Sequence, residues 1–443
     1  MKAFRGSILH FNDDHEAIYK TRPWENYQYF EDGVLLVDEG VVVVADRAEV
    51  LADQGLDLNM CEDYSGKLIM PGFIDSHVHA PQTEIIASYG EQLLDWLNNY
   101  TFPAELKFSD PNYAQAATEF FLDQLMSNGT TTAMVYTTVF RESTQLFFET
   151  AHARNLRMIA GKVMMDRHAP AGLLDDAMSS EKDSRQLIHQ WHNNGRLSYC
   201  VTPRFAPTSS PEQLEAAGRI LNDIPDVYLQ THLSENLGEI AWVKSLYPQA
   251  KDYLDVYDHY GLLTSRSVFG HGIHLSDREI GRLAETGAGI AFCPTSNLFL
   301  GSGLLNLARL ESLGVNVSIA TDVGGGTSFS LLKTLSDAYK VLQLQQQSLS
   351  VLKGLYMATL GNARALTLDR YIGNFSKGKE ADFNVIDLGA TPLQQYRKKN
   401  SRTLEEILFS LMILGDEHNI FHTYIKGKRW YFDKKRRFQP SIN

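Results

Sequence analysis

The sequence has few cysteines and no long hydrophobic run. Its 443 residues include only 3 cysteines, Cys61, Cys200 and Cys293, which lie far apart in the chain. This odd and scattered set argues against a framework of disulfide bonds and favours a reducing compartment, so we expect a cytoplasmic protein. No stretch approaches the roughly 18 uninterrupted apolar residues of a membrane span, and the N-terminal segment carries charges where a signal peptide needs an apolar core. We therefore expect neither secretion nor membrane anchoring.

The chain also has no excess of positive charge. Its 41 Lys and Arg residues stand against 53 Asp and Glu residues, which gives a formal net charge of -12. This balance disfavours binding to nucleic-acid phosphates or anionic membranes over most of the surface. The basic run KKRR at residues 434–437 is a local exception, which we interpret as a solvated terminus. With 44% hydrophobic residues, the composition indicates a globular protein with a large core, suited to a small neutral substrate.

The two ends of the chain resemble each other and differ from the middle. Short β-rich runs occur near the N-terminus and return near the C-terminus, at residues 30–45, 66–75, 372–388 and 422–432. We predict that residues 1–69 and 372–443 pair into one small β-module, a β-sandwich, beside a catalytic domain formed by residues 70–371. The alternative, two independent small domains, would require each end to bury its own core with fewer than about 75 residues.

The middle of the chain alternates apolar runs with helical stretches. Near-continuous runs of this kind predict a parallel sheet that is buried on both faces. Eight of them are the number that closes a TIM-type barrel, so we predict an α/β fold with a (β/α)8 barrel. The runs are FIDSHVH (73–79), TTTAMVY (130–136), RMIAGKVMM (157–165), LSYCVTPRF (197–205), VYLQTHLSE (227–235), SVFGHGIHL (267–275), GAGIAFCP (287–294) and VNVSIATD (315–322).

Several of these runs end in histidine or carboxylate, where a parallel barrel places its reacting groups. His77 and His79 are two residues apart on one strand, so both side chains project from one face and can converge on one metal ion. His232, His271 and Asp322 close three further runs. Each alone has an ordinary interpretation, as a structural histidine or as a helix N-cap. Their occurrence together at four strand ends favours a metal site.

The motifs PGFIDSHVH, THLSE, GHGIHL and SIATD occur in the order typical of the amidohydrolase superfamily, which the sequence resembles. Within it, the stretches SYGEQLLDWLNNYTFPAE, GKVMMDRHAP, VTPRFAPTSSPEQL, CPTSNLFLGSG and GNFSKGKEADF resemble the guanine deaminase family over nearly the whole chain. The resemblance implies a homodimeric enzyme that hydrolyses guanine to xanthine and ammonia.

The resemblance also implies one zinc ion per chain. Iron is an alternative, because ligands of this type do not discriminate sharply between the two metals. The binuclear branch of the superfamily uses a bridging lysine at the end of strand four, but here that run closes on Arg204, and Lys162 lies in the preceding run. We therefore favour a mononuclear site, and the ligands carried over from the resemblance are His77, His79, His232 and Asp322.

Glu235, three residues after His232, is the candidate proton carrier. Deamination of a purine needs one carboxyl group that delivers a proton to the ring nitrogen beside the attacked carbon and then to the departing ammonia. The alternative is a carboxylate at a helix start, stabilised by the helix dipole. In the implied mechanism, a metal-activated hydroxide attacks carbon two, Asp322 accepts a proton and orients the hydroxide, and His271 steers it or polarises the reacting carbon.

Substrate choice is expected to depend on groups that contact the purine edge. Gln82 can donate and accept hydrogen bonds, Arg204 can donate to the six-position carbonyl that guanine has and adenine lacks, and His271 lies nearby. Phe205 offers a flat face for stacking. The alternatives are a rim salt bridge for Arg204 and a core position for Phe205. Residues 82–108 form a long connection that could cover the base, in which we expect Trp96 to serve packing.

Two other functions remain as alternatives. Other aminohydrolases and chlorohydrolases of the superfamily share the metal-binding strands and act on different substrates. A non-catalytic scaffold would keep the barrel but show gaps in the ligand set, and here no ligand is missing. A cytidine-deaminase type of zinc site is excluded, because it requires paired cysteines and no two cysteines here are close in sequence.

Overall fold

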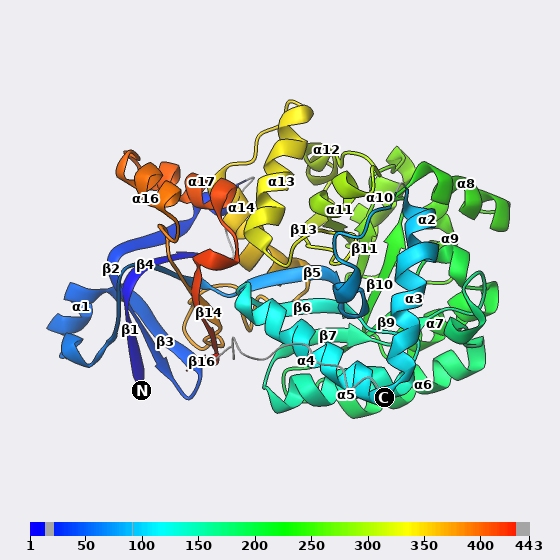
Figure 1. Cartoon of the computed structure of the whole chain (residues 1–443), viewed down its shortest axis with the longest axis horizontal. Coiled ribbons are helices and arrows are strands. Elements are labelled where there is room, and N and C mark those ends of the chain that lie inside the picture. Colours follow the sequence, from blue (N-terminus) through cyan, green and yellow to red (C-terminus); the bar gives the residue numbers. More distant parts are fainter. Residues whose placement is uncertain (14–21, 91, 431–443) are drawn as a thin grey trace.

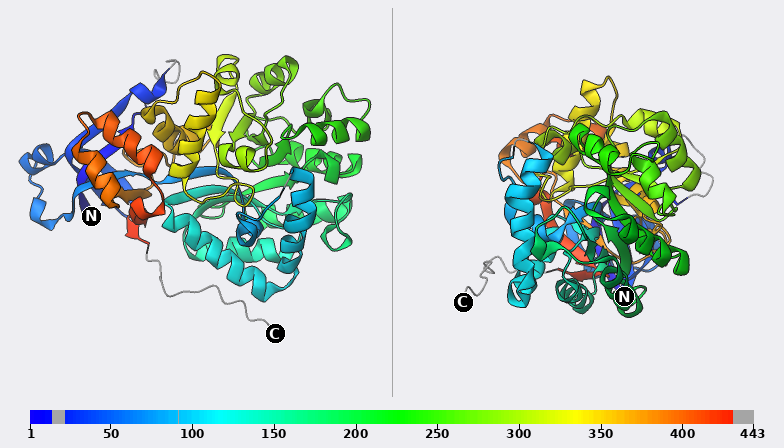
Figure 2. Two further views of the ribbon diagram at one scale, coloured as in Figure 1. Left: turned by 45° about the horizontal axis from the view of Figure 1, so that its top comes forward. Right: turned by 90° about the vertical axis from the view of Figure 1, so that its right-hand side faces the viewer.

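A barrel and a smaller β-sheet lie side by side along the long axis of the molecule (Figure 1). The structure is a computed structural model, and it describes residues 1–13, 22–90 and 92–430. The left view of Figure 2 shows the same separation of sheet and barrel. The basic run at 434–437 and the end of the predicted run 422–432 lie outside the described residues. Within the described ranges, no helix is both long enough and apolar enough to cross a membrane.

The predicted barrel is confirmed. Each of the eight apolar runs supplies a parallel strand, and the third run is divided into two strands that both pair with β9. All residues of β5 and β6 are buried, as a sheet covered on both faces requires. The strands are β5 (Phe73–His79), β6 (Thr130–Tyr136), β7 (Arg157–Gly161), β8 (Val163–Met164), β9 (Ser198–Pro203), β10 (Tyr228–Leu233), β11 (Ser267–His271), β12 (Gly289–Phe292) and β13 (Asn316–Ile319).

The ring closes between the first and last strands. The backbone N–H of Asp322 donates to the carbonyl of His77 at 3.0 Å, and the N–H of His79 donates to the carbonyl of Val323 at 2.8 Å. The Asn362 side chain reinforces this seam by donating to the carbonyls of Ile74 and Ile319, at 2.6 and 2.8 Å. Closure therefore places the end of β5 directly beside the segment that follows β13.

Helices between the strands and after the last one cover the outside of the barrel. α4 begins where the Asp110 side chain accepts a hydrogen bond from the N–H of Asn112, and α10 ends at Gly287, whose φ is 72°. These helices are α4 (Pro111–Ser127), α5 (Arg141–Ala153), α6 (Ala177–Trp191), α7 (Pro211–Asp223), α8 (Leu237–Leu246), α9 (Tyr253–His259), α10 (Asp277–Thr286), α11 (Pro294–Phe299), α12 (Leu307–Ser312), α13 (Leu331–Leu344), α14 (Val351–Tyr356) and α15 (Asn362–Ala365), with π-helical η9 (Met357–Gly361) between the last two.

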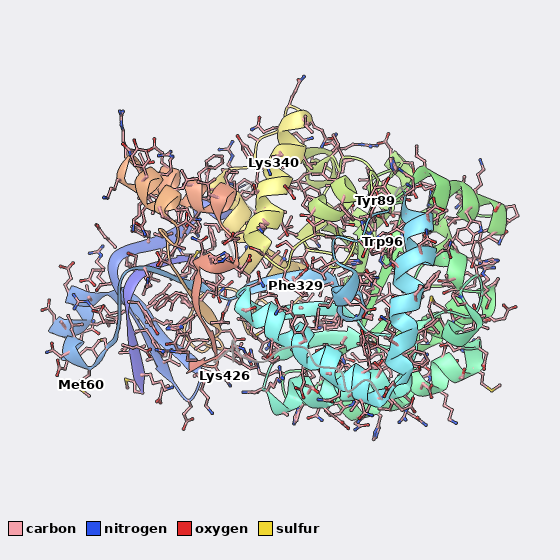
Figure 3. The ribbon with its side chains drawn as sticks, in the orientation of Figure 1. Met60, Tyr89, Trp96, Phe329, Lys340 and Lys426 are labelled. Carbon is pink, nitrogen blue, oxygen red and sulfur yellow. The ribbon has the colours of Figure 1, made fainter. Side chains whose placement is uncertain are left out.

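The long connection after β5 is helical. It begins with η4 (Ala80–Ile85), and a continuous helical stretch then runs through α2 (Leu93–Trp96), the π-helical segment η5 (Leu97–Thr101), α3 (Phe102–Leu106) and η6 (Lys107–Ser109). Figure 1 shows α2 and α3 as one long coil at the side of the barrel, and Figure 3 marks Trp96 on it. Further single-turn helices are η7 (Ala171–Leu173) and η8 (Ala206–Thr208).

The predicted β-module formed from both ends of the chain is confirmed. Its strands form one continuous sheet in the order β16-β15-β14-β4-β1-β2-β3. The sheet folds back on itself, because the N–H of Val42 donates to the carbonyl of Lys379 at 2.7 Å. Phe4, Phe383 and Tyr424 form part of the enclosed core. The strands are β1 (Lys2–Phe11), β2 (Tyr27–Asp38), β3 (Val41–Arg47), β4 (Glu62–Pro71), β14 (Phe383–Ile386), β15 (Ile420–Ile425) and β16 (Lys428–Arg429).

The C-terminal segment also contains two helices that the strand-rich pattern did not predict. The N–H groups of Gln394 and Glu406 are capped by the side chains of Thr391 and Thr403. α17 packs against α13 and α14 of the barrel, which explains why its sequence is apolar. The additional helices of both chain ends are α16 (Pro392–Lys399), α17 (Leu404–Leu414), α1 (Ala48–Asp53), η2 (Pro23–Glu25), η3 (Leu58–Met60) and η10 (Glu417–Asn419).

A buried ion-pair cluster joins the module to the barrel. Arg157, at the start of β7, pairs with both carboxylate oxygens of Glu380 at 2.7 and 2.8 Å. Arg196 donates from Nε to Glu380 at 3.0 Å and also pairs with Asp382. Burial alone would raise the pKa of Glu380, but the two guanidinium groups outweigh it and lower that pKa.

Candidate active site

The predicted metal ligands meet at the mouth of the barrel. The Nε2 atoms of His77 and His79 are 3.3 Å apart, and those of His79 and His232 are 3.2 Å apart. Asp322 Oδ1 lies 3.3 Å from Nε2 of His77 and 3.4 Å from Nε2 of His79. The three imidazole nitrogens therefore form one group, and the carboxylate of Asp322 faces the two that come from β5.

The surrounding backbone fixes these rings. Nδ1 of His232 donates to the carbonyl of Arg204 at 2.7 Å, so its Nε2 is free to bind a cation. Gly270 gives His77 its room, because a Cβ at Gly270 would lie 2.6 Å from Cε1 of that imidazole. Asp322 has a left-handed backbone with a φ of 51°, a conformation that is costly for a residue with a side chain and is common at active sites.

The donor set fits one divalent cation. Burial lowers the pKa of His77, His79 and His232, which favours the neutral imidazole that binds metals. Burial alone would raise the pKa of Asp322, but a hydrogen bond and charge from His77, together with His271, lower it well below its usual range. Neutral imidazole and carboxylate ligands suit zinc, and they suit iron as well.

Among the described residues, no lysine lines the pocket that holds this cluster. Lys162 pairs with Asp175 through Nζ and Oδ2 at 2.5 Å. Oδ1 of Asp175 accepts a further hydrogen bond from the Gln213 side chain at 2.8 Å. Lys162 is therefore held in an ion pair of its own, which agrees with a mononuclear site.

Glu235 lies beside the ligand cluster, in the loop between β10 and α8. One of its oxygens is 3.3 Å from Nε2 of His271, and the other accepts a hydrogen bond from Ser302 Oγ at 3.0 Å. Burial raises the pKa of Glu235 to about 7. A carboxyl group with this pKa exchanges protons in both directions near neutral pH, as a proton carrier must. Helix α8 begins only at Leu237, after the N-cap Asn236, so Glu235 precedes the helix.

His271 contacts both acidic groups. Its Nδ1 donates to Asn297 Oδ1 at 2.9 Å, and its Nε2 lies 3.8 Å from Oδ2 of Asp322. Burial opposes protonation of this imidazole, but the charges of Glu235 and Asp322 outweigh burial, so the pKa of His271 is raised. His271 has a left-handed backbone, with a φ of 70°.

The residues predicted to bind substrate line one pocket together with His79, His232 and Asp322 of the ligand cluster. Gln82 accepts a hydrogen bond from the N–H of Gly324 at 3.2 Å, and Phe205 is in edge contact with Trp242. Arg204 forms a salt bridge with Glu105, yet it lines the pocket rather than the rim. Polar lining residues are His79, Gln82, Arg204, His232, Glu235, Glu239, His271 and Asp322, while the apolar wall includes Leu93, Trp96, Leu97, Phe205 and Leu300.

Sequence reasoning missed several groups that hold these residues. Glu239 accepts the backbone N–H of Glu235 at 2.9 Å and a hydrogen bond from Tyr253 at 2.7 Å. Asn297 likewise accepts a hydrogen bond from Nδ1 of His271, and Glu105 accepts hydrogen bonds from Nη1 of Arg204. Glu239 is four residues after Glu235, at a helical spacing that could have been noticed, whereas Asn297 and Glu105 reach the pocket from other elements.

Comparison with known proteins agrees with this geometry. The model of the amidohydrolase family matches residues 68–430. The chain belongs to the amidohydrolase family. It is 51% identical over 434 residues to the guanine deaminase of Escherichia coli (strain K12), and the match covers 97% of this chain and 98% of that protein.

Solved structures of guanine deaminases have the same fold. The structure of E. coli guanine deaminase matches with a TM-score of 0.94 and 51% identity, covering 97% of this chain and 99% of that chain. Guanine deaminase from C. acetobutylicum, with bound guanine in its active site, matches with a TM-score of 0.87 and 29% identity. That match covers 97% of this chain and 100% of the other.

Proposed function

We propose that this protein is a guanine deaminase, which hydrolyses guanine to xanthine and ammonia. The observation that carries the proposal is that three of the four metal-type donors, Glu235 with its raised pKa, and the pair Gln82 and Arg204 line one pocket. The same substrate is supported by the E. coli guanine deaminase, which is 51% identical, and by the C. acetobutylicum structure, which holds guanine in its active site. The chlorohydrolases and other aminohydrolases of the family remain the alternative that a substrate assay decides.

We propose that one zinc ion is held by the four converging donors. Zinc held by these residues would supply a nucleophile at neutral pH, because it would lower the pKa of a water molecule to about 7. Iron is the alternative metal for these donors. The ligands are His77, His79, His232 and Asp322.

Glu235 moves the protons of the reaction. Its pKa of about 7 allows it to accept a proton from the attacking water and to deliver one to the ring nitrogen beside carbon two. The hydroxyl group added at carbon two gives up the second proton of the water through Asp322, Glu235 delivers that proton to the amino group, and ammonia leaves as the new carbonyl forms. Glu239 and Ser302 hold Glu235 in place through the backbone N–H and the carboxylate. Water and guanine thus yield xanthine and ammonia, and the carboxyl group returns to its starting state.

His271 and Asp322 orient the attack. Asp322 faces the ligand histidines and accepts a proton, while His271, with its raised pKa, donates from Nε2 toward Glu235 and Asp322. Such preorganised donors stabilise negative charge that develops during the reaction. Gln82 and Arg204 present hydrogen-bonding groups to the purine edge, and Phe205 presents an apolar face for stacking.

The remaining predictions concern the whole molecule. A homodimer, a cytoplasmic location and the division into residues 70–371 and residues 1–69 plus 372–443 stay predictions. The ion-pair cluster of Arg157 and Arg196 with Glu380 lies between these two parts and is consistent with the division. No contact with nucleic acid or membrane is expected, in agreement with the net charge of -12.

The test uses one purified preparation. Metal content per chain is measured, and the protein is incubated with guanine while formation of xanthine and ammonia is followed. We expect about one zinc or iron per chain, loss of turnover on chelation and recovery on adding zinc. Absence of xanthine formation by the metal-loaded protein would refute the proposal. Turnover of another amino-purine or of a chloro-substituted ring, without guanine turnover, would support the alternative substrates.

A further inference from the structure

A buried ion pair stands in the wall of the pocket, outside the ligand cluster. Nη1 of Arg204 donates to both carboxylate oxygens of Glu105, at 2.7 and 2.9 Å. The exposed fractions of the two side chains are only 3% and 0%. The pair joins elements that are far apart in the chain, because Arg204 follows β9 and Glu105 lies on α3.

The helical stretch that carries Glu105 also supplies much of the apolar wall. Leu93, Trp96 and Leu97 of this stretch line the pocket. The ring of Phe102, one turn before Glu105, lies under the guanidinium of Arg204 with 5.6 Å between the guanidinium carbon and the ring centroid. The same element therefore shapes the pocket and holds the guanidinium group from two sides.

The pairing leaves part of the guanidinium group for a ligand. In the described part of the chain, Nε and Nη2 of Arg204 make no hydrogen bond, and the residue lines the pocket. The backbone carbonyl of Arg204 accepts from Nδ1 of His232, so the position of its main chain is fixed as well. Glu105 thus occupies one nitrogen, and the remaining donors have a defined direction.

Glu105 also compensates the charge of the arginine. A buried guanidinium group without a partner is costly and attracts anions strongly, since the interior screens charges poorly. With a carboxylate at 2.7 Å, the pair presents hydrogen-bond donors with little net charge. Guanine is neutral near pH 7, whereas xanthine loses a ring proton near neutral pH. The two purines therefore differ in net charge, which is the property to which such a pocket responds.

We propose that Glu105 is a positioning and specificity-determining residue: it orients Arg204 toward the six-position carbonyl and makes the pocket select neutral oxopurines over their anions. This rests on the proposed function. Because Glu105 cancels the charge of Arg204, the pocket does not retain the anion of its own product. Product release at and above neutral pH then depends on a residue that does not touch the substrate.

The test compares Glu105→Gln with the wild type. KM and kcat for guanine are measured at about pH 6 and about pH 8. The inhibition constants of xanthine and hypoxanthine are measured at the same two pH values, and hypoxanthine serves as the reference because it stays mostly neutral up to about pH 8. We expect the KM for guanine to rise about tenfold, because the donors of Arg204 lose their fixed direction. The ratio of wild-type to variant inhibition constants for xanthine should rise about tenfold over this range, whereas the ratio for hypoxanthine should stay constant.

Two further variants isolate the role of the charge. Glu105→Asp keeps the carboxylate and should leave the pH dependence of xanthine inhibition as in the wild type, even if KM changes. Glu84→Gln is the control: it removes the ion pair in which Glu84 lies 2.7 Å from Nζ of Lys107. This pair lies beside the same helical stretch but away from the pocket lining, so the KM for guanine and the pH dependence of xanthine inhibition should both stay unchanged. Metal content and thermal unfolding are measured for each variant.

The outcomes separate the two proposals. If wild-type protein does not turn over guanine, the proposed function is wrong. If wild-type protein is active, but Glu105→Gln leaves the xanthine ratio independent of pH and KM unchanged, only the role of Glu105 is overturned. Should Glu105→Gln fail to fold, the wild type still decides: its inhibition by xanthine must weaken from about pH 6 to about pH 8 relative to hypoxanthine, and a strengthening would contradict the proposal.

Discussion

The barrel mouth and the contact between barrel and β-module are both buried clusters of ionisable side chains, but their groups are paired differently. At the contact between barrel and module, Arg157 and Arg196 both pair with the carboxylate of Glu380, and Arg196 also pairs with Asp382. Every charge there has a partner of opposite sign within hydrogen-bond distance. Such a cluster holds two parts of a structure in register.

At the barrel mouth, the imidazole rings of His77, His79 and His271 face the carboxylate of Asp322. Nδ1 of His77 and Nδ1 of His79 are buried and have no hydrogen-bond partner in the described part of the chain. Ser234, His271 and Asp322 adopt left-handed backbone conformations, each of which costs on the order of 1 to 3 kcal/mol. Incomplete pairing and strained backbone are thus present where the chemistry is proposed, while each charge of the ion-pair cluster at the contact has a partner.

The largest effect is expected for Glu235→Gln. The amide keeps the shape of the side chain but cannot carry a proton, so kcat should fall by about 10²- to 10⁴-fold. Folding stability should not fall, because the variant removes a carboxyl group whose pKa burial raises to about 7. Steady-state kinetics and chemical denaturation check both parts. An active Glu235→Gln enzyme would remove Glu235 from the mechanism.

Glu380→Gln should produce the opposite result. It leaves Arg157 without its carboxylate in a buried contact, so the free energy of unfolding should fall by about 3 to 5 kcal/mol, while kcat at 25 °C stays unchanged. Denaturant titration and the guanine assay provide the measurement. Glu285→Gln is the matched control, because its ion pair with Arg282 is exposed and should contribute less than about 1 kcal/mol. Equal losses in both variants would contradict the comparison.

Arg204→Gln should reduce kcat/KM for guanine by roughly 10- to 100-fold, because a hydrogen bond from a charged donor contributes about 1.5 to 3 kcal/mol. Metal content should not change, since only the backbone carbonyl of Arg204 contacts His232. Kinetics with guanine and metal analysis check this prediction. An unaffected rate would favour another substrate of the family.

The smallest effect concerns His10 on β1, far from the active site. Burial lowers the pKa of His10 to about 4, below its usual value of 6.5, and its ring lies 5.4 Å from that of Phe375. The folded protein therefore binds this proton less well than the unfolded chain, and stability declines as the pH falls from about 6.5 toward 4. From pH 7 to pH 5 the contribution is about 2 kcal/mol.

Comparison with His10→Phe isolates this contribution. The variant should lose about that much less stability over the same pH range, measured by denaturant titration at both pH values. Asp13 and Lys379 near this ring are present in both proteins, so the difference reports His10. Identical pH dependence in the two proteins would show that His10 is protonated freely in the folded state.

Much of the fold could be predicted because parallel barrel strands are buried on both faces, which leaves near-continuous apolar runs in the sequence. The pairing of the two chain ends followed from their common strand-rich style. α16 and α17 were missed, since a run such as LEEILFSLMIL is apolar on most sides and shows no clear one-sided period, although only Leu408, Leu411 and Met412 are buried. The packing of α17 against α13 and α14 is indicated by no local pattern.

The candidate site likewise contains residues that could be predicted from the sequence and residues that could not. His77, His79, His232, His271 and Asp322 could be proposed because strand ends of a parallel barrel meet at one mouth. Gln82, Arg204 and Phe205 came from resemblance to a family. Glu105 and Asn297 could not be proposed, since the separation of 99 residues between Glu105 and Arg204 carries no periodic signal.

The order of strands, their burial and the residue types at their ends are local properties, and the linear sequence is sufficient to specify them. Closure of the ring between β5 and β13, the seating of the helix that carries Glu105, and the burial that shifts the pKa of Glu235 exist only after folding. Distances and local dielectric depend on groups remote in the chain, so the geometry of this pocket was decided by tertiary packing.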